Sequence, residues 1–142
     1  AMKNPWESIV VRALSGDMNQ NSLVLRITYD RISLLLMGDA DTVVEGILIS
    51  SGGNLSSQIL KVGHHGGTSA SGPEFLEKVR PLVSIISVGE ENYYGYPTER
   101  TLSNLQAAGS SVYRTDTCSE IKITTDGLSF SISPEKSCEL PA

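Results

Sequence analysis

The sequence predicts a mixed α/β protein whose strands and helices pack in layers. Strand-like apolar segments open the chain, and apolar residues at helical spacing then lie between later strand-like segments. Two further strand-like segments close the chain. Its 142 residues are enough for one domain with a hydrophobic core and too few for two ordinary domains.

The first part of the chain predicts three strands and then a helix. Residues 8–14 and 32–37 are apolar enough for strands, and residues 22–29 alternate as a half-buried strand does. We expect the segments 22–29 and 32–37 to form a hairpin. The apolar face of the alternating strand comprises Leu23, Leu25, Ile27 and Tyr29. A helix should follow Gly38 and Asp39 and end at the Gly52-Gly53 pair. Its apolar residues at helical spacing are Val43, Val44, Ile47 and Leu48.

Strands and helices alternate in the remainder of the chain. Ser71 and Glu74 have the spacing of a capping box and predict a helix that ends near Arg80, before Pro81. A second helix should begin at Thr98, with Leu102, Leu105 and Ala108 facing inward and Gly109 ending it. Five strands are predicted around these helices, at residues 58–62, 83–88, 111–115, 120–125 and 128–133. The last two should form a hairpin at Asp126-Gly127.

Composition limits the functions that these residues can have. The net charge is −5 and the 11 Lys and Arg residues are scattered, which argues against a stand-alone DNA-binding module. An enzyme that acts on phosphates remains compatible with this charge, because bound metal ions can supply the positive charge. The longest apolar run, residues 32–38, is far too short for a membrane-spanning helix. We therefore expect no membrane contact from this chain itself.

The two cysteines, Cys118 and Cys138, are not arranged as a zinc site, because no C-x-x-C motif is present. We favour two unrelated thiols. A disulfide that ties the C-terminal tail to the strand after Cys118 is the alternative in an oxidising compartment.

Polar residues follow three of the predicted strands. They are Asp39, the pair His64-His65, and the segment 89–97, GEENYYGYP. Ligands of open α/β sheets gather at the carboxyl ends of strands, so these residues should converge in space. Taken alone, Asp39 is better explained as a helix N-cap than as a metal ligand. One carboxylate with one imidazole would nevertheless make half of a Zn²⁺ or Mn²⁺ site. Adjacent side chains diverge, so one histidine would ligate the metal and the other would position a water or a substrate oxygen.

The order of these motifs resembles a known family. N-S-L-V-L, G-D, L-K-V-x-H-H-G, I-S-V-G…N-x-Y-G-x-P and Y-R-T-D follow one another between about Asn21 and Gly127. In this the chain resembles the metallo-β-lactamase-type domain of the DNA-internalisation competence protein ComEC and its relatives. The resemblance implies an αββα sandwich, in which two mixed sheets pack between helices and a metal site lies along one edge. Residues 128–142 would form a terminal strand and tail.

The resemblance also implies roles for particular residues. Asp39 would be the metal-bridging carboxylate, and His65, rather than His64, the later ligand of Zn²⁺ or Mn²⁺. Four residues would lie on the substrate side of the site: Asn21, Ser22, Asn92 and Tyr96. The implied activity is metal-dependent hydrolysis of a phosphodiester or related ester during DNA uptake, at the extracytoplasmic face of the cell membrane, with DNA as a partner of the parent protein.

The sequence departs from the family's pattern where its metal site is concerned. The H-x-H-x-D-H run that defines the site is absent, so we expect residues 1–142 to be a single partial domain, the second half of a split sandwich. A catalytic zinc takes three protein ligands, which this chain alone does not offer. Three smaller departures remove polar groups from the site or its surroundings: Tyr96 replaces the usual His, Gly67 a Ser and Gln58 an Asp.

These observations leave three hypotheses. The chain is part of a metal-dependent hydrolase and inactive without the missing N-terminal half, or it is a non-catalytic interaction module of a DNA-uptake membrane protein, or it is an excised half-domain. A half-sandwich would leave an apolar face exposed, which predicts a homo-oligomer that buries this face.

Overall fold

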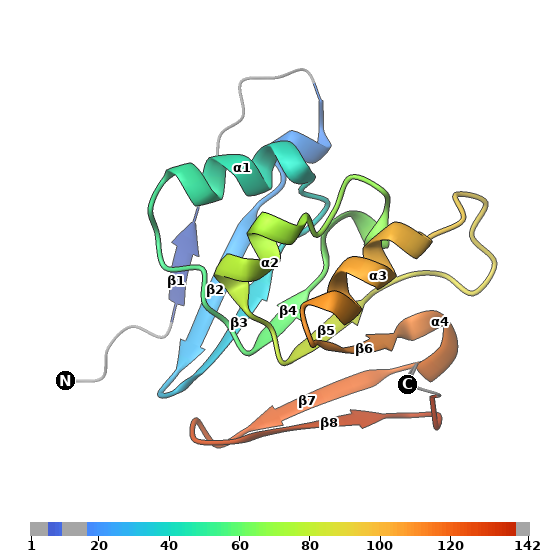
Figure 1. Cartoon of the computed structure of the whole chain (residues 1–142). Coiled ribbons are helices and arrows are strands. Elements are labelled where there is room, and N and C mark those ends of the chain that lie inside the picture. Colours follow the sequence, from blue (N-terminus) through green and yellow to red (C-terminus); the bar gives the residue numbers. More distant parts are fainter. Residues whose placement is uncertain (1–5, 10–16, 139–142) are drawn as a thin grey trace.

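The computed structural model describes residues 6–9 and 17–138 (Figure 1), and side chains only for residues 17–138. Its main sheet has six strands in chain order. They are β1 (Trp6–Ile9), β2 (Val24–Tyr29), β3 (Ile32–Leu36), β4 (Ile59–Lys61), β5 (Val83–Ile86) and β6 (Ser111–Arg114). The first three pair antiparallel and β3 to β6 pair parallel, so the sheet is mixed. The strand predicted at residues 8–14 overlaps β1 at its start, and its remainder lies outside the described residues.

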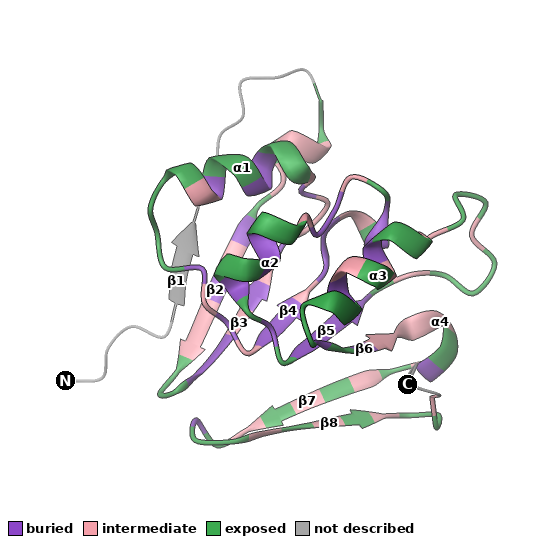
Figure 2. Cartoon of the chain, in the orientation of Figure 1, coloured by how far each residue is buried: buried purple, intermediate pink, exposed green. Residues whose placement is uncertain are grey.

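Three helices connect the parallel strands and cover one face of the sheet (Figure 1). They are α1 (Thr42–Ser50), α2 (Pro73–Val79) and α3 (Glu99–Ala107). The strands β3 to β6 follow one another in a single direction, and right-handed crossovers then place every connecting helix on the same face. The main core lies between these layers, where Figure 2 shows the buried residues. It includes Leu35, Val44, Leu60, Phe75 and Leu105. The predicted α/β class, with a mixed sheet flanked by helices, is confirmed.

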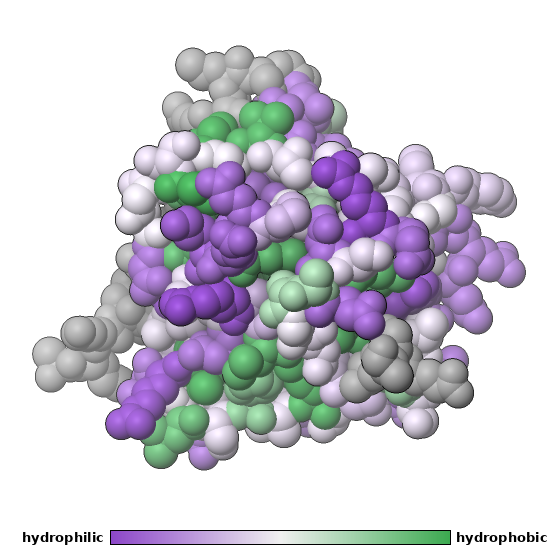
Figure 3. Space-filling model, viewed as in Figure 1, coloured by the Kyte–Doolittle hydropathy of each residue, from purple (hydrophilic) through white to green (hydrophobic). Residues whose placement is uncertain are grey.

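A separate hairpin packs against the other face of the sheet. Its strands are β7 (Ile121–Thr125) and β8 (Phe130–Pro134), preceded by the short helix α4 (Thr115–Cys118). Apolar residues of the hairpin contact apolar residues of β3, β4 and β5 in a second cluster. Figure 3 shows apolar residues gathered in the lower part of the molecule, where the hairpin meets the sheet. The hairpin turn is attached to the β2–β3 turn, because the Arg31 N–H donates to the Gly127 carbonyl (2.8 Å).

Strand β2 turns its apolar face to the less covered side of the sheet. Leu23 and Tyr29 are 60% and 54% exposed, whereas the side chain of Arg26 on the opposite face is only 7% exposed. The guanidinium of Arg26 can be buried because it donates hydrogen bonds to the Ser56 carbonyl (2.8 Å) and the Ser33 hydroxyl (2.9 Å). The half-buried strand predicted from the alternation is therefore present, but its polar face is the more buried one.

The helix caps differ from the predicted ones. Asp41, and not Asp39, caps α1, since its carboxylate accepts from the Val43 and Val44 N–H groups (2.9 and 3.2 Å). Ser71 does not cap α2, whose N-cap is Gly72. The carboxylate of Glu45 on α1 accepts from the N–H groups of both residues instead.

Some residues of the predicted inward faces are exposed. Val43 and Ile47 of α1 are 50% and 38% exposed, because the apolar side chains of this helix that face the core are Val44 and Leu48, with Ile49 partly buried against it. Ala108 is exposed as well, since α3 ends at Ala107.

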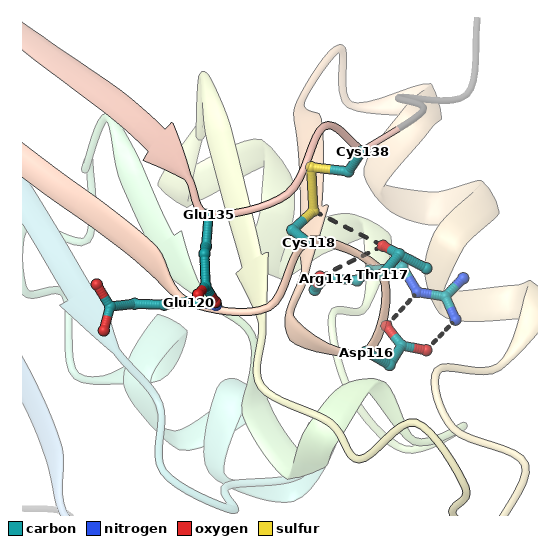
Figure 4. Close-up of a disulfide and its surroundings, with 7 residues drawn as sticks. All are labelled: Arg114, Asp116, Thr117, Cys118, Glu120, Glu135 and Cys138. Atoms are coloured by element: carbon teal, nitrogen blue, oxygen red, sulfur yellow. Dashed lines mark hydrogen bonds and ion pairs between the residues drawn. A yellow bond between two sulfur atoms is a disulfide. The ribbon is translucent and has the colours of Figure 1, made fainter.

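A disulfide joins Cys118 to Cys138 (Figure 4), so the favoured expectation of two unrelated thiols is wrong. Cys118 lies just before the hairpin β7–β8 and Cys138 just after it. Antiparallel pairing of these strands brings the two ends of the hairpin together, which sequence separation alone does not reveal. The disulfide closes the open end of the hairpin.

Candidate functional site

The carboxyl ends of β3, β4 and β5 meet at one edge of the sheet and enclose a cavity of about 290 Å³. The loop after β3 contributes Asp39, the loop after β4 contributes both histidines, and the loop after β5 contributes the segment around Asn92. The lining residues are Asp39, His64, His65, Val88, Gly89, Asn92, Tyr94 and Tyr96. The convergence expected from the strand ends is present.

The backbone at residues 38–39 turns sharply and directs Asp39 toward the cavity. Gly38 has a φ of +57°, and its α-carbon lies so close to Leu23 and Ser22 that a β-carbon would meet the Leu23 carbonyl at 3.2 Å. The Asp39 N–H donates to the Ser22 hydroxyl (3.2 Å), which fixes the loop. Because Asp41 caps the helix, the carboxylate of Asp39 is not used as a cap.

The imidazole of His65 lies between the Ser87 carbonyl and the Asp39 carboxylate. Its Nδ1 is 2.7 Å from the carbonyl oxygen, and its Nε2 is 3.2 Å from Oδ1 of Asp39. A carbonyl oxygen only accepts hydrogen bonds, so Nδ1 carries the proton that it donates. In the neutral imidazole the Nε2 lone pair then faces a carboxylate, and two acceptors at this distance require a cation between or beside them.

That cation can be a proton or a metal ion, and the donor set suits a metal. A histidine that ligates a metal usually donates its other ring N–H to a carbonyl or carboxylate, as His65 does. Ligands of a tetrahedral zinc at about 2.0–2.2 Å lie roughly 3.4 Å apart. The separation between His65 Nε2 and Asp39 Oδ1 is close to this value. Both side chains remain about half exposed and are accessible from the cavity.

The second histidine points to different partners. In His64, Nδ1 lies 3.4 Å from the Ser69 hydroxyl and Nε2 lies 3.4 Å from the Asn19 amide nitrogen. The ring also packs edge-on against Tyr96, with centroids 5.6 Å apart. The structure therefore brings Asp39 and His65 together and places the His64 nitrogens elsewhere. Sequence reasoning missed Asn19, because it lies 45 residues before His64 and belongs to no recognisable motif.

The two histidines share an unusual backbone conformation. Both have positive φ, +46° in His64 and +53° in His65, a region that costs a non-glycine residue on the order of 1 kcal/mol or more. The following Gly66 approaches Pro97 so closely that a β-carbon would lie 2.7 Å from the proline ring. Close packing of this loop against the segment before α3 holds the strained turn in place.

The loop after β5 is held by Asn92. Its side-chain amide accepts from the Tyr96 N–H and donates to the Tyr96 carbonyl, both at 2.8 Å. The Tyr96 ring lies over Gly67, where a β-carbon would be 3.0 Å from Cζ of the ring. Gly67 and Tyr96, two of the departures from the family's pattern, thus depend on each other. The tyrosine ring, larger than the usual histidine ring, occupies the space beside residue 67.

The remaining predicted residues lie differently. Ser22 contacts the site through Asp39, but the Asn21 amide donates to the Asp17 carbonyl (3.0 Å) and Asn21 does not line the cavity. Gln58 was expected near the site and is instead at the amino end of β4, where it bonds to Ser33 and Arg31.

Lys61 is a further charged residue next to the site that sequence reasoning did not single out. Its ammonium lies 3.4 Å from the Gly38 carbonyl. Burial lowers the pKa of Lys61, and the neighbouring Asp39 carboxylate opposes this shift. The lysine places a partly buried positive charge beside the carboxylate.

In the part of the chain that the structure describes, no group of three or more His, Cys, Asp and Glu side chains could hold a metal ion. Asp39 and His65 therefore supply two donors. None of the described helices has the length and apolar character to cross a membrane.

Comparison with known proteins identifies relatives over most of the chain. Competence protein ComA of Neisseria gonorrhoeae is 42% identical over 101 residues, which is 70% of this chain and 15% of the relative. ComE operon protein 3 of Bacillus subtilis is 37% identical over 98 residues, 69% of this chain and 13% of the relative. Recombination protein 2 of Haemophilus influenzae is 31% identical over 105 residues, 74% of this chain and 13% of the relative.

No family model matches the chain. The chain spans about a seventh of the length of these relatives. Its homologues are competence proteins related to ComEC.

Proposed function

We propose that this chain is one half of a metallo-β-lactamase-type domain that hydrolyses phosphodiesters during DNA uptake in competence. The parent protein would hold Zn²⁺ or Mn²⁺, and the chain alone would be inactive. The observation that carries this proposal is the convergence of Asp39 and His65. The Nδ1–H of His65 is committed to the Ser87 carbonyl, so its Nε2 and the Asp39 carboxylate offer one cation two donors 3.2 Å apart.

Residues around this pair have chemistry suited to a phosphate ester. A bound divalent cation supplies Lewis acidity toward a phosphoryl oxygen. The Tyr96 hydroxyl, on the same cavity, can donate a hydrogen bond to a substrate oxygen, whereas both nitrogens of His64 face Ser69 and Asn19. Lys61 adds a positive charge beside Asp39, which favours a negatively charged substrate. In this proposal, substrate reaches these residues through the cavity that they line.

The missing N-terminal half would complete both the fold and the site. Its strands would extend the sheet that begins with the hairpin β7–β8 and cover the apolar face of β2, where Leu23 and Tyr29 are exposed. It would also bring the further ligands that a catalytic metal needs. The relatives are about seven times longer than the matched segment, which leaves room for such a half in the parent protein.

Titration of the purified chain with metal, followed by calorimetry, tests whether Asp39 and His65 together bind a metal ion. We expect weak binding of Zn²⁺ or Mn²⁺ to the isolated chain, because two protein donors are fewer than a catalytic site uses. The substitutions Asp39→Asn and His65→Ala should abolish it. The matched control His64→Ala, one residue away, should leave the affinity within about threefold, because the His64 nitrogens face Ser69 and Asn19. Equal affinity in Asp39→Asn and the unsubstituted chain would refute the proposed half-site.

The isolated chain should also self-associate through its uncovered face. A double substitution, Leu23→Lys with Tyr29→Lys, should convert the oligomer into a monomer in size-exclusion chromatography. A clean monomer of the unsubstituted chain at high concentration would contradict this part of the proposal.

The second candidate is a non-catalytic interaction module of a DNA-uptake protein. Two observations favour it: the described residues supply only two metal donors, and Tyr96 stands where the family usually has a histidine able to act as a general acid. Metal content and DNA hydrolysis by the full-length parent protein separate the candidates. The module predicts neither, whereas the hydrolase predicts both, with hydrolysis lost in the Asp39→Asn variant.

A further inference from the structure

The loop between β5 and α3 exposes two aromatic side chains beside the candidate site. Tyr93 is fully exposed, at 104% of its reference area, and Tyr94 is 79% exposed. Figure 1 shows this loop, in yellow, projecting from the body of the molecule. Tyr94 also lines the cavity that contains Asp39 and His65. Single exposed aromatic residues are common on protein surfaces, but here two adjacent ones lie at the edge of the candidate site.

The loop holds the ring of Tyr94 in a defined arrangement with that of Tyr96. Asn92 bonds to the backbone of Tyr96 and to the Gly89 carbonyl, which closes the loop at its base. The rings of Tyr94 and Tyr96 stack, with centroids 5.5 Å apart and planes inclined by 20°. A stacked pair that extends from the cavity to solvent offers a flat surface for a further planar group.

Charges on the same loop restrict what this group can be. Glu90 and Glu91 are exposed next to Tyr93, and the chain carries a net charge of −5. A phosphate group would be repelled here, whereas an uncharged planar ring would not. The positive charge of Lys61 thus lies beside Asp39 at the site, whereas the exposed loop carries aromatic and acidic residues.

We propose that Tyr93 and Tyr94 form a stacking platform for the unpaired bases of single-stranded DNA. This inference rests on the proposed function, in which a phosphodiester occupies the Asp39–His65 cavity. The bases next to that phosphate would then lie on the tyrosines. Base faces are available for stacking in a single strand and hidden in a duplex, so the platform selects single-stranded substrate.

Binding through base stacking predicts how the affinity for DNA depends on salt concentration. Proteins that hold nucleic acid through phosphate contacts release counterions and lose affinity steeply as salt rises. Here few cations face the strand and the contacts are to bases. Affinity should therefore depend only weakly on salt concentration.

Fluorescence anisotropy with a labelled thymidine oligonucleotide, in the presence of a chelator, tests this inference apart from catalysis. An abasic oligonucleotide of the same length keeps the phosphates and removes the bases. We expect the unsubstituted chain to bind the thymidine strand and to bind the abasic strand and the corresponding duplex at least tenfold more weakly. Tyr93→Ala and Tyr94→Ala should each reduce affinity by about fivefold to a hundredfold, the range measured for loss of one stacked base. Tyr93→Phe should retain it, because the ring and not the hydroxyl makes the contact.

Glu90→Gln provides a matched change on the same loop and should raise affinity slightly. The inference is overturned if the abasic strand binds as well as the thymidine strand, if Tyr93→Ala and Tyr94→Ala bind normally, or if no binding is detected. Because the chelator removes metal, these results do not depend on whether the parent protein hydrolyses DNA. Loss of metal binding in Asp39→Asn with normal oligonucleotide binding would separate the two proposals.

Discussion

Glu45 should make this protein less stable as the pH rises toward neutrality. Its side chain is only 3% exposed and joins α1 to the start of α2, accepting from the Ser71 N–H (2.6 Å) and the Gly72 N–H (2.9 Å). Burial raises the pKa of this carboxyl from 4.5 to about 7. The two backbone hydrogen bonds oppose the shift, and the charge of Asp41 adds a smaller increase.

The direction of the effect follows from where the proton is held. Between pH 4.5 and about pH 7 the folded protein keeps a proton on Glu45 that the unfolded chain has lost. The folded state then binds more protons than the unfolded state, so the free energy of unfolding falls as pH rises. The contribution of Glu45 to the free energy of unfolding is fully present below pH 4.5 and is lost as the pH rises to about 7. At about 1.4 kcal/mol for each pH unit between the two pKa values, it is on the order of 3 kcal/mol at most.

Urea unfolding of Glu45→Gln and the unsubstituted chain, followed by circular dichroism across this pH range, measures the contribution. Glutamine cannot ionise. The free energy of unfolding of Glu45→Gln, relative to that of the unsubstituted chain, should therefore increase by on the order of 3 kcal/mol from the acid to the alkaline end of the range. Other titrating groups, such as the histidines, are common to both proteins and cancel. The exposed Glu74 provides the control Glu74→Gln, for which we expect no such divergence. Parallel pH profiles for Glu45→Gln and the unsubstituted chain would refute the reasoning.

Three other substitutions test the packing. Cys138→Ser should lower the free energy of unfolding by about 3 kcal/mol, because the disulfide with Cys118 closes a loop of 20 residues; equal denaturation midpoints in oxidised and reduced protein would contradict this. Ser71→Ala should stabilise the protein by about 1 kcal/mol in urea unfolding, since the buried Ser71 hydroxyl has no hydrogen-bond partner among the described residues, and a clear loss would count against it. Arg26→Met should cost about 2 kcal/mol by the same measurement, because the Ser56 carbonyl and the Ser33 hydroxyl lose their donor; unchanged stability would show that water replaces it.

The spacing of apolar residues along the sequence predicted the strands and helices of this fold well. This spacing reflects the layer of the fold against which each element packs. The helical spacing around Val44 follows from packing on one side of a sheet, whereas the alternation of residues 22–29 identified a strand but not the face that is more buried. The rule that ligands gather at the carboxyl ends of parallel strands also brought Asp39 and His65 together correctly, although 26 positions separate them in the sequence. Predicting these features requires only the order of the strands and the knowledge that one face of each element is buried.

What sequence reasoning missed depends on three-dimensional partners. Asp39 and Asp41 are equivalent candidates for a helix cap, and only the position at which α1 begins decides between them. Ser71 fits a capping box, yet a glutamate from another helix reaches the same N–H groups. Arg26 lies on the polar face of an alternating strand, and its burial follows from the carbonyl and hydroxyl groups that surround it.

The tandem histidines show why two adjacent residues can have separate functions. Each has a left-handed backbone, and two such residues in succession turn their side chains toward different walls of the cavity. His65 meets Asp39 and the Ser87 carbonyl, whereas His64 meets Asn19, Ser69 and the Tyr96 ring. A conventional strand or helix would not hold both imidazoles at one cavity in this way. The strain of the turn is compensated by the close contact of Gly66 with Pro97, which in turn positions the loop of Tyr93 and Tyr94 next to the histidines. The candidate metal donors and the proposed stacking platform are therefore parts of one packed unit, and a change in Gly66 should disturb both.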